Sequence, residues 1–339
     1  MYYKNVYKYD EMKRAEHMAV RNAVGWYFFT HHLVKVTGAD AAAFLDKMFA
    51  NPIANLKPGR ERYTTMLNEE GQIIDDVVIF RHDDNAFWIS TLFAPKLIPW
   101  FDAHKGDMDV SYENITSQYD MYAVQGPKSA NLLNQLLEAP VDDMKFFSFA
   151  SNTLDGIPVI INRAGFTGEA YGYEIYISPE HDEMIEKKLT DLAKELGGAQ
   201  VTEFQIMAMT LPTEKGFYYM RDLQFTNPFE VGLDKGIGWD KDFIGKEALL
   251  KIKEEGPARE MVGFTVAEPD IHINHKAFGG PGEAVLFDGE EVGRVSKITY
   301  SYLKDTNIGY ILAKKGALKK GDVVTMRGYE GVITDKVFA

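Results

Sequence analysis

The sequence contains no cysteine among its 339 residues, which excludes disulfide bonds, thiolate metal ligands and a cysteine nucleophile. It also lacks an apolar run long enough to cross a membrane. Its first residues, MYYKNVYKYDEMKR, are polar and charged, whereas a signal peptide needs an apolar stretch. We therefore expect a soluble, cytoplasmic protein that has no membrane partner.

Basic residues are few for a protein that would bind a polyanion. The chain has 37 Lys and Arg against 50 Asp and Glu, a formal net charge of −13. Nucleic acids and anionic membranes require a basic surface, so we expect neither as a main partner. Two histidine pairs also fall short of a metal site: His31 and His32 lack a third ligand, and HINH (272–275) lies in a turn-rich segment. No metal is expected.

The order of predicted elements indicates an α+β protein with two or three domains. Strands and helices alternate up to about residue 255, and short apolar runs separated by glycines follow. We therefore expect one region at 1–255, built from two interleaved α+β subdomains, and an all-β, jelly-roll or barrel-like domain at 256–339. Helices are expected at 37–52, 125–138, 178–198 and 242–257, neighbouring antiparallel strands at 59–67 and 85–93, and two strands around a glycine-rich turn at 157–178.

Two adjacent acids interrupt the predicted strand GQIIDDVVIF (71–80). Side chains alternate between the faces of a strand, so Asp75 and Asp76 point to opposite sides, and both sides are otherwise apolar. A buried charge is costly unless it is paired or used. Alternation predicts a functional or paired acid here but does not say which of the two it is.

A third acid, Glu174, lies in the segment RAGFTGEAYGYEIYI (163–177). Its face of the strand carries Gly172 and Tyr176, a narrow surface on which a carboxylate can accept hydrogen bonds from a planar pair of N–H donors. An ion pair with a nearby base is the alternative. No phosphate-binding loop of the P-loop or dinucleotide type is present.

Two aromatic clusters accompany these acids. GWYFFTHHLVKV (25–36) places aromatic residues directly before His31 and His32, and alternation turns one histidine inward without identifying it. EKGFYYMRD (214–222) contains Tyr218 and Tyr219. A role in the core is the default for such aromatic residues.

Six segments in this order resemble the glycine-cleavage T-protein (aminomethyltransferase) family of folate-dependent enzymes, and the C-terminal part matches more loosely through residues 293–314. The segments are HMAVRNAVG (17–25), RYTTMLNEEGQIIDDVVIF (62–80), AVQGPK (123–128), RAGFTGEAYGYEI (163–175), TNPFEVGLD (226–234) and DFIGKEALL (242–250).

The resemblance implies a three-domain clover-leaf fold with tetrahydrofolate in its central hole. By position it implies that Asp76 is the catalytic aspartate beside the reactive nitrogens of the folate, and that Glu174 pairs with the N–H groups of the pterin ring. It also places Tyr63 and Phe166, with the adjacent Thr167, near the folate.

The chain departs from the family pattern at several positions. An acid of the family is here Phe28, and a region that carries arginines and a glutamate is EFQIMAMTLPTE (203–214), with Ile206, Thr210 and Pro212 in their place. The loss of charged residues suggests a changed donor, and related demethylases use the same scaffold for methyl transfer.

We therefore predict a methyltransferase that moves a methyl group from a small O-, S- or N-methylated donor to N5 of tetrahydrofolate. In this hypothesis His31 protonates the leaving group, and Trp26, Tyr27, Phe28, Tyr218 and Tyr219 line the donor site. An aryl methyl ether is favoured, because no acid is placed to complement a cationic donor. A glycine-cleavage aminomethyltransferase and a non-catalytic folate-binding protein are the alternatives, and no lipoyl carrier protein is expected as a partner.

Overall fold

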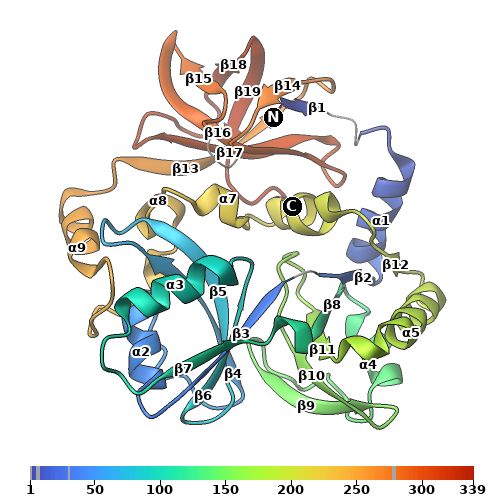
Figure 1. Cartoon of the computed structure of the whole chain (residues 1–339). Helices are drawn as coiled ribbons and strands as arrows, with labels where there is room; N and C mark the ends of the chain where they lie inside the picture. The colour runs from blue at the N-terminus through green and yellow to red at the C-terminus, as the bar shows by residue number, and fades with distance from the viewer. Residues whose placement is uncertain (1, 5–7, 30, 277–279) are drawn as a thin grey trace.

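The computed structural model describes residues 2–4, 8–29, 31–276 and 280–339. Figure 1 shows three lobes around a common centre: two contain an open sheet and the third, at the top, contains a closed barrel. The expected α+β clover leaf is confirmed. The helices that connect or join the lobes are α1 (Glu11–Asn22), η3 (Gln205–Thr210, a π-helical stretch), α6 (Leu211–Glu214), α7 (Met220–Leu223), α8 (Pro228–Val231), η4 (Asp234–Gly236) and α9 (Lys246–Glu255).

The first lobe is built on a five-stranded antiparallel sheet in the order β4-β5-β6-β3-β7. One face is covered by helices whose buried residues, such as Phe44 and Phe101, pack on Val77 and Ile79. The expectation that residues 59–67 and 85–93 are neighbouring strands is wrong, because β5 lies between β4 and β6. The elements are β3 (His32–Thr37), α2 (Ala41–Met48), β4 (Arg60–Leu67), β5 (Ile73–Arg81), β6 (Ala86–Thr91), α3 (Ala94–His104), β7 (Ser111–Asn114) and η1 (Thr116–Gln118).

The second lobe contains a six-stranded sheet in the order β12-β2-β8-β11-β10-β9. Leu132, Leu133, Leu136 and Leu137 form the apolar stripe predicted for residues 125–138 and are buried against one face of this sheet. The predicted helix at 178–198 opens with a short 3₁₀ turn before α5. The elements are β2 (Gly25–Phe28), β8 (Asp120–Gln125), α4 (Ser129–Leu136), β9 (Phe149–Leu154), β10 (Ile157–Asn162), β11 (Gly172–Ile177), η2 (Pro179–His181), α5 (Asp182–Glu195) and β12 (Ala199–Gln200).

The two sheets turn their remaining faces toward each other. β2 ends at Phe28 in the second sheet and β3 begins at His32 in the first, so two consecutive strands belong to different lobes. Phe80 and Trp88 of the first sheet share a buried cluster with Met121 and Tyr176 of the second. Residues on these two facing surfaces can therefore build one site between the lobes.

The third lobe is the six-stranded barrel expected after residue 255, closed in the order β13-β17-β16-β15-β18-β19. Closure leaves no unpaired sheet edge and encloses a core that includes Phe264, Val295 and Ile311. We keep the division at residues 255 and 256 as a proposed domain boundary. The strands are β13 (Arg259–Val266), β15 (Ala284–Phe287), β16 (Glu290–Ser301), β17 (Thr306–Lys314), β18 (Val323–Met326) and β19 (Tyr329–Thr334), and β14 (His272–Asn274) pairs with β1 (Tyr2–Lys4).

Within the described ranges, no helix combines the length and the apolar character needed to cross a lipid bilayer.

Candidate active site between the two sheets

Asp76 lies on the face of the first sheet that turns toward the second lobe. Tyr63, on the neighbouring strand, pairs with Val78 and so shares this face. Its hydroxyl donates a hydrogen bond to Asp76, with 3.0 Å between Oη and Oδ2. Burial raises the pKa of Asp76 to about 6, although the bond from Tyr63 opposes this rise. At neutral pH Asp76 is therefore mainly an ionised acid in poorly hydrated surroundings.

Asp75 points to the opposite, helix-covered face and is fully enclosed, with 2% of its surface exposed. The hydroxyl of Thr91 donates to its Oδ2 at 2.7 Å, and the backbone N–H of Asp76 donates to its Oδ1 at 2.9 Å. Burial and the neighbouring charge of Asp76 raise the pKa of Asp75 to about 8. Asp75 is thus satisfied by local partners, and Asp76 is the acid available to a ligand.

Glu174 lies on β11, on the face of the second sheet that meets the first. Asn162 of β10 donates to its Oε2 at 2.9 Å, and the hydroxyl of Tyr176 donates to the same oxygen at 3.2 Å. Burial raises the pKa of Glu174, and these two bonds limit the rise. The side chain is half-buried, so its other oxygen is left for a ligand with N–H donors.

The aromatic residues of the segment 25–36 divide between two sides of the second sheet. Trp26 is completely buried under α4 and α5, and Phe28 packs on the same core. Both face away from Glu174, so neither is placed to contact a donor, and we correct the prediction for these two residues. Tyr27 and Phe29 lie on the opposite side, where Phe29 packs on Phe166 with 4.8 Å between ring centroids.

The two adjacent histidines, His31 and His32, also lie in different surroundings. The ring of His31 is buried against Tyr176, with 5.4 Å between centroids, and its Nε2 has no hydrogen-bond partner in the described part of the chain. Burial lowers the pKa of His31 to about 4, so the ring is neutral at physiological pH. His32 instead accepts a hydrogen bond through Nδ1 from the backbone N–H of Ala94, at the start of α3. His31 is therefore the inward-facing histidine.

Thr167 does not face the site as predicted. It is fully buried, and its hydroxyl donates to Oε1 of Gln125 at 2.8 Å. Gln125 in turn donates to the backbone carbonyls of Ala164 and Tyr173. Thr167 therefore holds the loop that carries Phe166 in place, and a direct contact with a cofactor is not available to its hydroxyl.

Tyr218 and Tyr219 approach the site from the segment before α7. Tyr218 accepts a hydrogen bond from Lys336 at 2.8 Å, and its burial raises its pKa. Burial raises the pKa of Tyr219 as well, and the nearby charge of Asp76 adds to that rise. Asp222, which accepts a bond from the backbone of Tyr219, is paired with the buried Lys297 of the barrel at 2.7 Å. The barrel thus positions both tyrosines.

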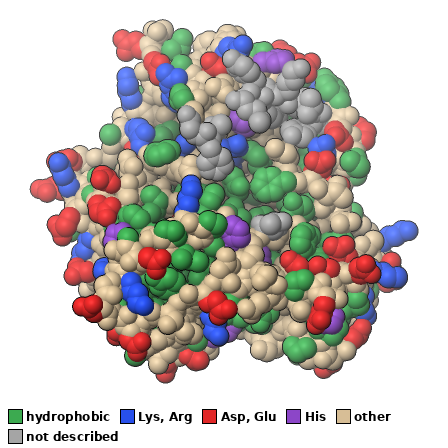
Figure 2. Space-filling view, in the orientation of Figure 1, with side chains coloured by type: hydrophobic (Ala, Val, Ile, Leu, Met, Phe, Trp, Pro, Cys, Tyr) green, Lys and Arg blue, Asp and Glu red, His purple; other side chains and the backbone are tan. Residues whose placement is uncertain are grey.

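A pocket of about 180 Å³ is lined by residues that include Tyr63, Thr65, Asn51 and Leu233. A larger cavity of about 500 Å³ lies against the barrel, lined by residues such as Lys276 and Lys314, and touches none of the predicted site residues. We place the site beside the smaller pocket, because Tyr63, which lines it, donates a hydrogen bond to Asp76, an acid whose pKa is raised. Figure 2 shows hydrophobic side chains gathered in the middle of this face of the molecule.

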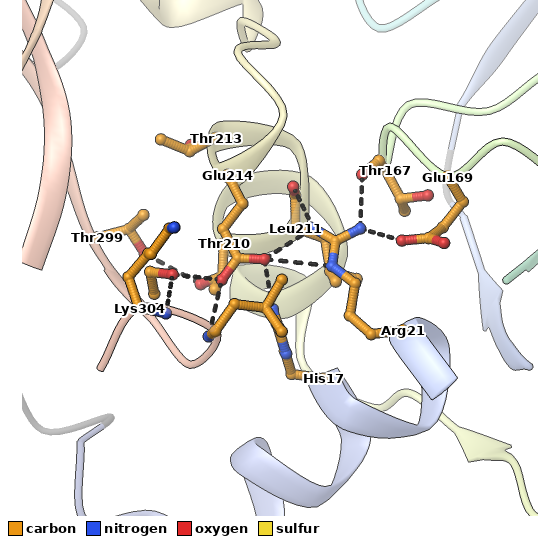
Figure 3. A network of polar contacts seen from close by, with 12 residues as sticks. His17, Arg21, Thr167, Glu169, Thr210, Leu211, Thr213, Glu214, Thr299 and Lys304 are labelled. Carbon is orange, nitrogen blue, oxygen red and sulfur yellow. Dashed lines mark hydrogen bonds and ion pairs between the residues drawn. The ribbon is translucent and has the colours of Figure 1, made fainter. Parts of the chain in front are cut away.

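A buried polar network beside the site was missed by the sequence analysis (Figure 3). Both Arg21 and His17, from α1, point toward Glu214, with 2.8 Å and 2.9 Å to its Oε2. Arg21 also donates to the carbonyl of Thr167 and pairs with Glu169. Burial alone would raise the pKa of Glu214, but His17, Arg21 and the hydroxyl of Ser301 lower it to about 2. The partners lie up to 197 residues apart in sequence, so no local pattern could reveal them.

Comparisons with known proteins agree with this architecture. Residues 1–241 match the family model described as the GCVT N-terminal domain. The chain is 31% identical to a protein named aminomethyltransferase from Halalkalibacterium halodurans, over 96% of this chain and 88% of that protein. It is 30% identical to the protein of the same name from Thermotoga maritima, over 95% and 85%. The solved structure of glycine cleavage system aminomethyltransferase T from Bartonella henselae superimposes with a TM-score of 0.84 at 22% identity, covering 96% of this chain and 89% of that one, which supports the fold.

Proposed function

Because the chain belongs to the family of the GCVT N-terminal domain, we propose that it is a folate-dependent one-carbon transferase. The observation that carries the proposal is the pair of half-buried acids on facing sheets. Asp76 is held by Tyr63 on one side, and Glu174 is held by Asn162 and Tyr176 on the other. One acid is suited to the reacting end of a folate and the other to the recognition of its ring.

The residues present fit a reduced folate. Glu174 is a half-buried carboxylate whose Oε2 is held by Asn162 and Tyr176, and a carboxylate can accept hydrogen bonds from the planar N–H donors that a pterin edge offers. Phe29 and Phe166 supply an aromatic surface beside it. When bound, tetrahydrofolate supplies a nucleophilic nitrogen that accepts the one-carbon unit.

Asp76 is the catalytic residue in this proposal. An ionised acid in a site with little water stabilises positive charge that develops on a nearby nitrogen, and it can receive a proton from it. Tyr63 fixes its orientation through the 3.0 Å hydrogen bond. His31 contacts Tyr176, the partner of Glu174, so we propose that it supports the ring-binding end and does not protonate a leaving group.

For the donor, we propose an aminomethyl group on a lipoyl carrier protein as the first candidate. Relatives that match over nearly the whole chain are named aminomethyltransferase. This similarity counts against our expectation that a lipoyl carrier protein is not a partner, and it favours the alternative over the methyl-transfer hypothesis.

Methyl transfer from a small methylated donor is the second candidate, because of one specific observation. Ile206 is completely buried in an apolar cluster that includes Tyr27, at a position where the resemblance leads us to expect a charged residue. A neutral, aromatic methyl ether suits such surroundings better than a charged donor. Tyr218 and Tyr219 are the proposed donor-binding residues.

One experiment distinguishes these candidates. The protein is incubated with tetrahydrofolate and either an aminomethyl-loaded lipoyl carrier protein or a panel of O-, S- and N-methyl compounds, and the folate products are identified by mass spectrometry. Methylenetetrahydrofolate with ammonia release supports the first candidate, and methyltetrahydrofolate supports the second. Folate binding without any product would indicate a non-catalytic binding protein.

Two variants test the assigned roles. Asp76→Asn is expected to lower the rate by about 100-fold or more while folate still binds. Glu174→Ala is expected to weaken folate binding by about 10-fold or more, because it removes charge-assisted hydrogen bonds. Full turnover in Asp76→Asn, or undiminished affinity in Glu174→Ala, would overturn the corresponding role.

A further inference from the structure

A second glutamate lies directly behind Glu174. Glu61, on β4 of the first sheet, is 4% exposed, and its Oε1 is buried without a hydrogen-bond partner in the described part of the chain. The backbone N–H of Glu61 donates to the carbonyl of Phe147, and its side chain reaches the second lobe, where it accepts a hydrogen bond from Asn162. A buried carboxyl group with an unsatisfied oxygen is energetically costly, so its presence calls for an explanation.

Asn162 connects the two acids. Its Nδ2 donates to Oε2 of Glu174 at 2.9 Å and to Oε2 of Glu61 at 3.3 Å. Its Oδ1 accepts from the backbone N–H of Glu174 at 3.0 Å, which fixes the orientation of the amide. Two carboxyl groups thus share one NH₂ group, and this group is neutral.

Two carboxylates cannot both be charged here without a large cost. Each would be desolvated, and they would repel each other, so the pair retains a proton. Burial and the charge of Glu174 raise the pKa of Glu61 well above its usual range, against the opposing effects of Asn162 and Arg60. Glu174 is the more exposed of the two, and it is the acid that can meet a ligand. The retained proton therefore belongs on Glu61.

We propose that Glu61 is a positioning residue of the folate site. Glu61 carries the proton that the pair retains, so that Glu174 stays ionised and is the single charge facing the pterin edge. The inference rests on the proposed function and names a residue that composition and motif did not single out. Covering the site with a ligand removes water from both acids. Binding therefore favours the singly charged pair, and it draws in a proton wherever Glu61 has begun to ionise.

Other ionisable groups around Glu61 do not account for this behaviour. Tyr176 bonds to Glu174, and its pKa is raised by burial and by both glutamates, so it remains protonated. Arg60 is a permanent cation on the same strand. His31, which contacts Tyr176, titrates near pH 4, below the range of the effect.

The test counts protons taken up when a folate binds. Calorimetric titrations with 5-formyltetrahydrofolate, which lacks a basic N5, are run in buffers of different ionisation enthalpy from about pH 6 to about pH 9. We expect the native protein to take up as much as about one proton toward the alkaline end and to lose affinity there. Glu61→Gln, which mimics the neutral acid, should bind with no proton uptake and with constant affinity.

Further variants separate this role from a general loss of stability. Glu61→Leu is also neutral but removes one of the two acceptors of the Asn162 NH₂ group, so it should abolish proton uptake and weaken binding. Glu16→Gln makes the same chemical change at a buried glutamate that bonds to Thr202, and it should behave as the native protein does. Asp75→Asn controls for another buried acid whose pKa is raised, and this variant should retain the proton uptake.

The outcomes decide between the two proposals. Folate binding without proton uptake at any pH, or equal uptake in Glu61→Gln, would overturn the role of Glu61. If no folate binds, the proposed function fails, and the free protein still tests the pair through its unfolding free energy. Because the pKa of Glu61 is higher in the folded state than in the unfolded state, the stability that this residue contributes to the folded protein is complete below the unfolded pKa and falls as pH rises. Glu61→Gln should lack that fall.

Discussion

At the scale of single residues, adjacent acids differ because of the side of the strand on which each lies. Asp75 is enclosed with Thr91 beneath the helices of the first lobe. Asp76 faces the second lobe and is held by Tyr63. The same residue type therefore serves structure at one position and is available for chemistry at the next.

Tyr63→Phe tests this arrangement through the pH dependence of the reaction. If ionised Asp76 is required, kcat/KM rises with pH through about 6, the pKa of that group. Loss of the Tyr63 hydroxyl removes a bond that favours the ionised form, so the acid limb should move upward by about one pH unit. The rate is measured across pH with the natural tyrosine as the reference. An unmoved acid limb would show that Asp76 does not set it.

At the scale of elements, the loop between β10 and β11 places Phe166 beside the site. Gly168 has a φ of +75°, and a Cβ there would lie 2.3 Å from Cβ of Lys215. Glycine tolerates this backbone region, whereas an L-residue with a Cβ does so at a cost of about 1–2 kcal/mol. The loop can therefore approach α6 only because this residue has no side chain.

Gly168→Ala is expected to displace this loop and to weaken folate binding as well as lower the melting temperature. Gly156→Ala is a matched control, because its φ is +80° but a Cβ there meets nothing within 4 Å. The control should lose only the backbone contribution to stability and keep its affinity. Affinity is measured by calorimetry and stability by thermal unfolding. Equal affinities for the two variants would show that the loop does not form part of the folate site.

At the scale of the whole molecule, Glu214 links the lobes. It accepts bonds from Arg21 and His17 of α1 and from Ser301 of the barrel, and Arg21 extends the network to the loop at Thr167. The backbone carbonyl of Glu214 also accepts bonds from Phe338 and Ala339 near the end of the chain. One acid therefore contributes to the placement of the second lobe relative to the barrel.

Acid should weaken this link in a defined range. The pKa of Glu214 is lowered to about 2 in the folded protein, so its contribution is complete above its unfolded value near 4.5 and is lost as pH falls toward 2. Glu214→Gln should cost about 3 kcal/mol at neutral pH and flatten the acid side of the stability profile. Denaturant unfolding across pH measures both, with Glu16→Gln as the control. A profile that keeps the native slope would contradict the role of Glu214.

Much of the fold follows from local patterns, because helix stripes and strand alternation depend on residues close together in the chain. The apolar stripe of Leu132, Leu133 and Leu136 predicts a helix that is indeed buried. The change to strand and turn after residue 255 predicts the barrel. Alternation in β2 separates Trp26 from Tyr27 but cannot say which side is the core, because helices cover one face and another sheet covers the other.

The sequence by itself determined the α+β fold class, the C-terminal barrel and the opposite facing of Asp75 and Asp76, since each depends on a short periodic pattern. Only the tertiary structure decided which face of each sheet meets the other lobe. It therefore assigned Trp26 and Phe28 to the core and brought Glu61 behind Glu174 and Arg21 onto Glu214. Contacts between residues far apart in sequence leave no local signal, because they form only when separate elements pack together.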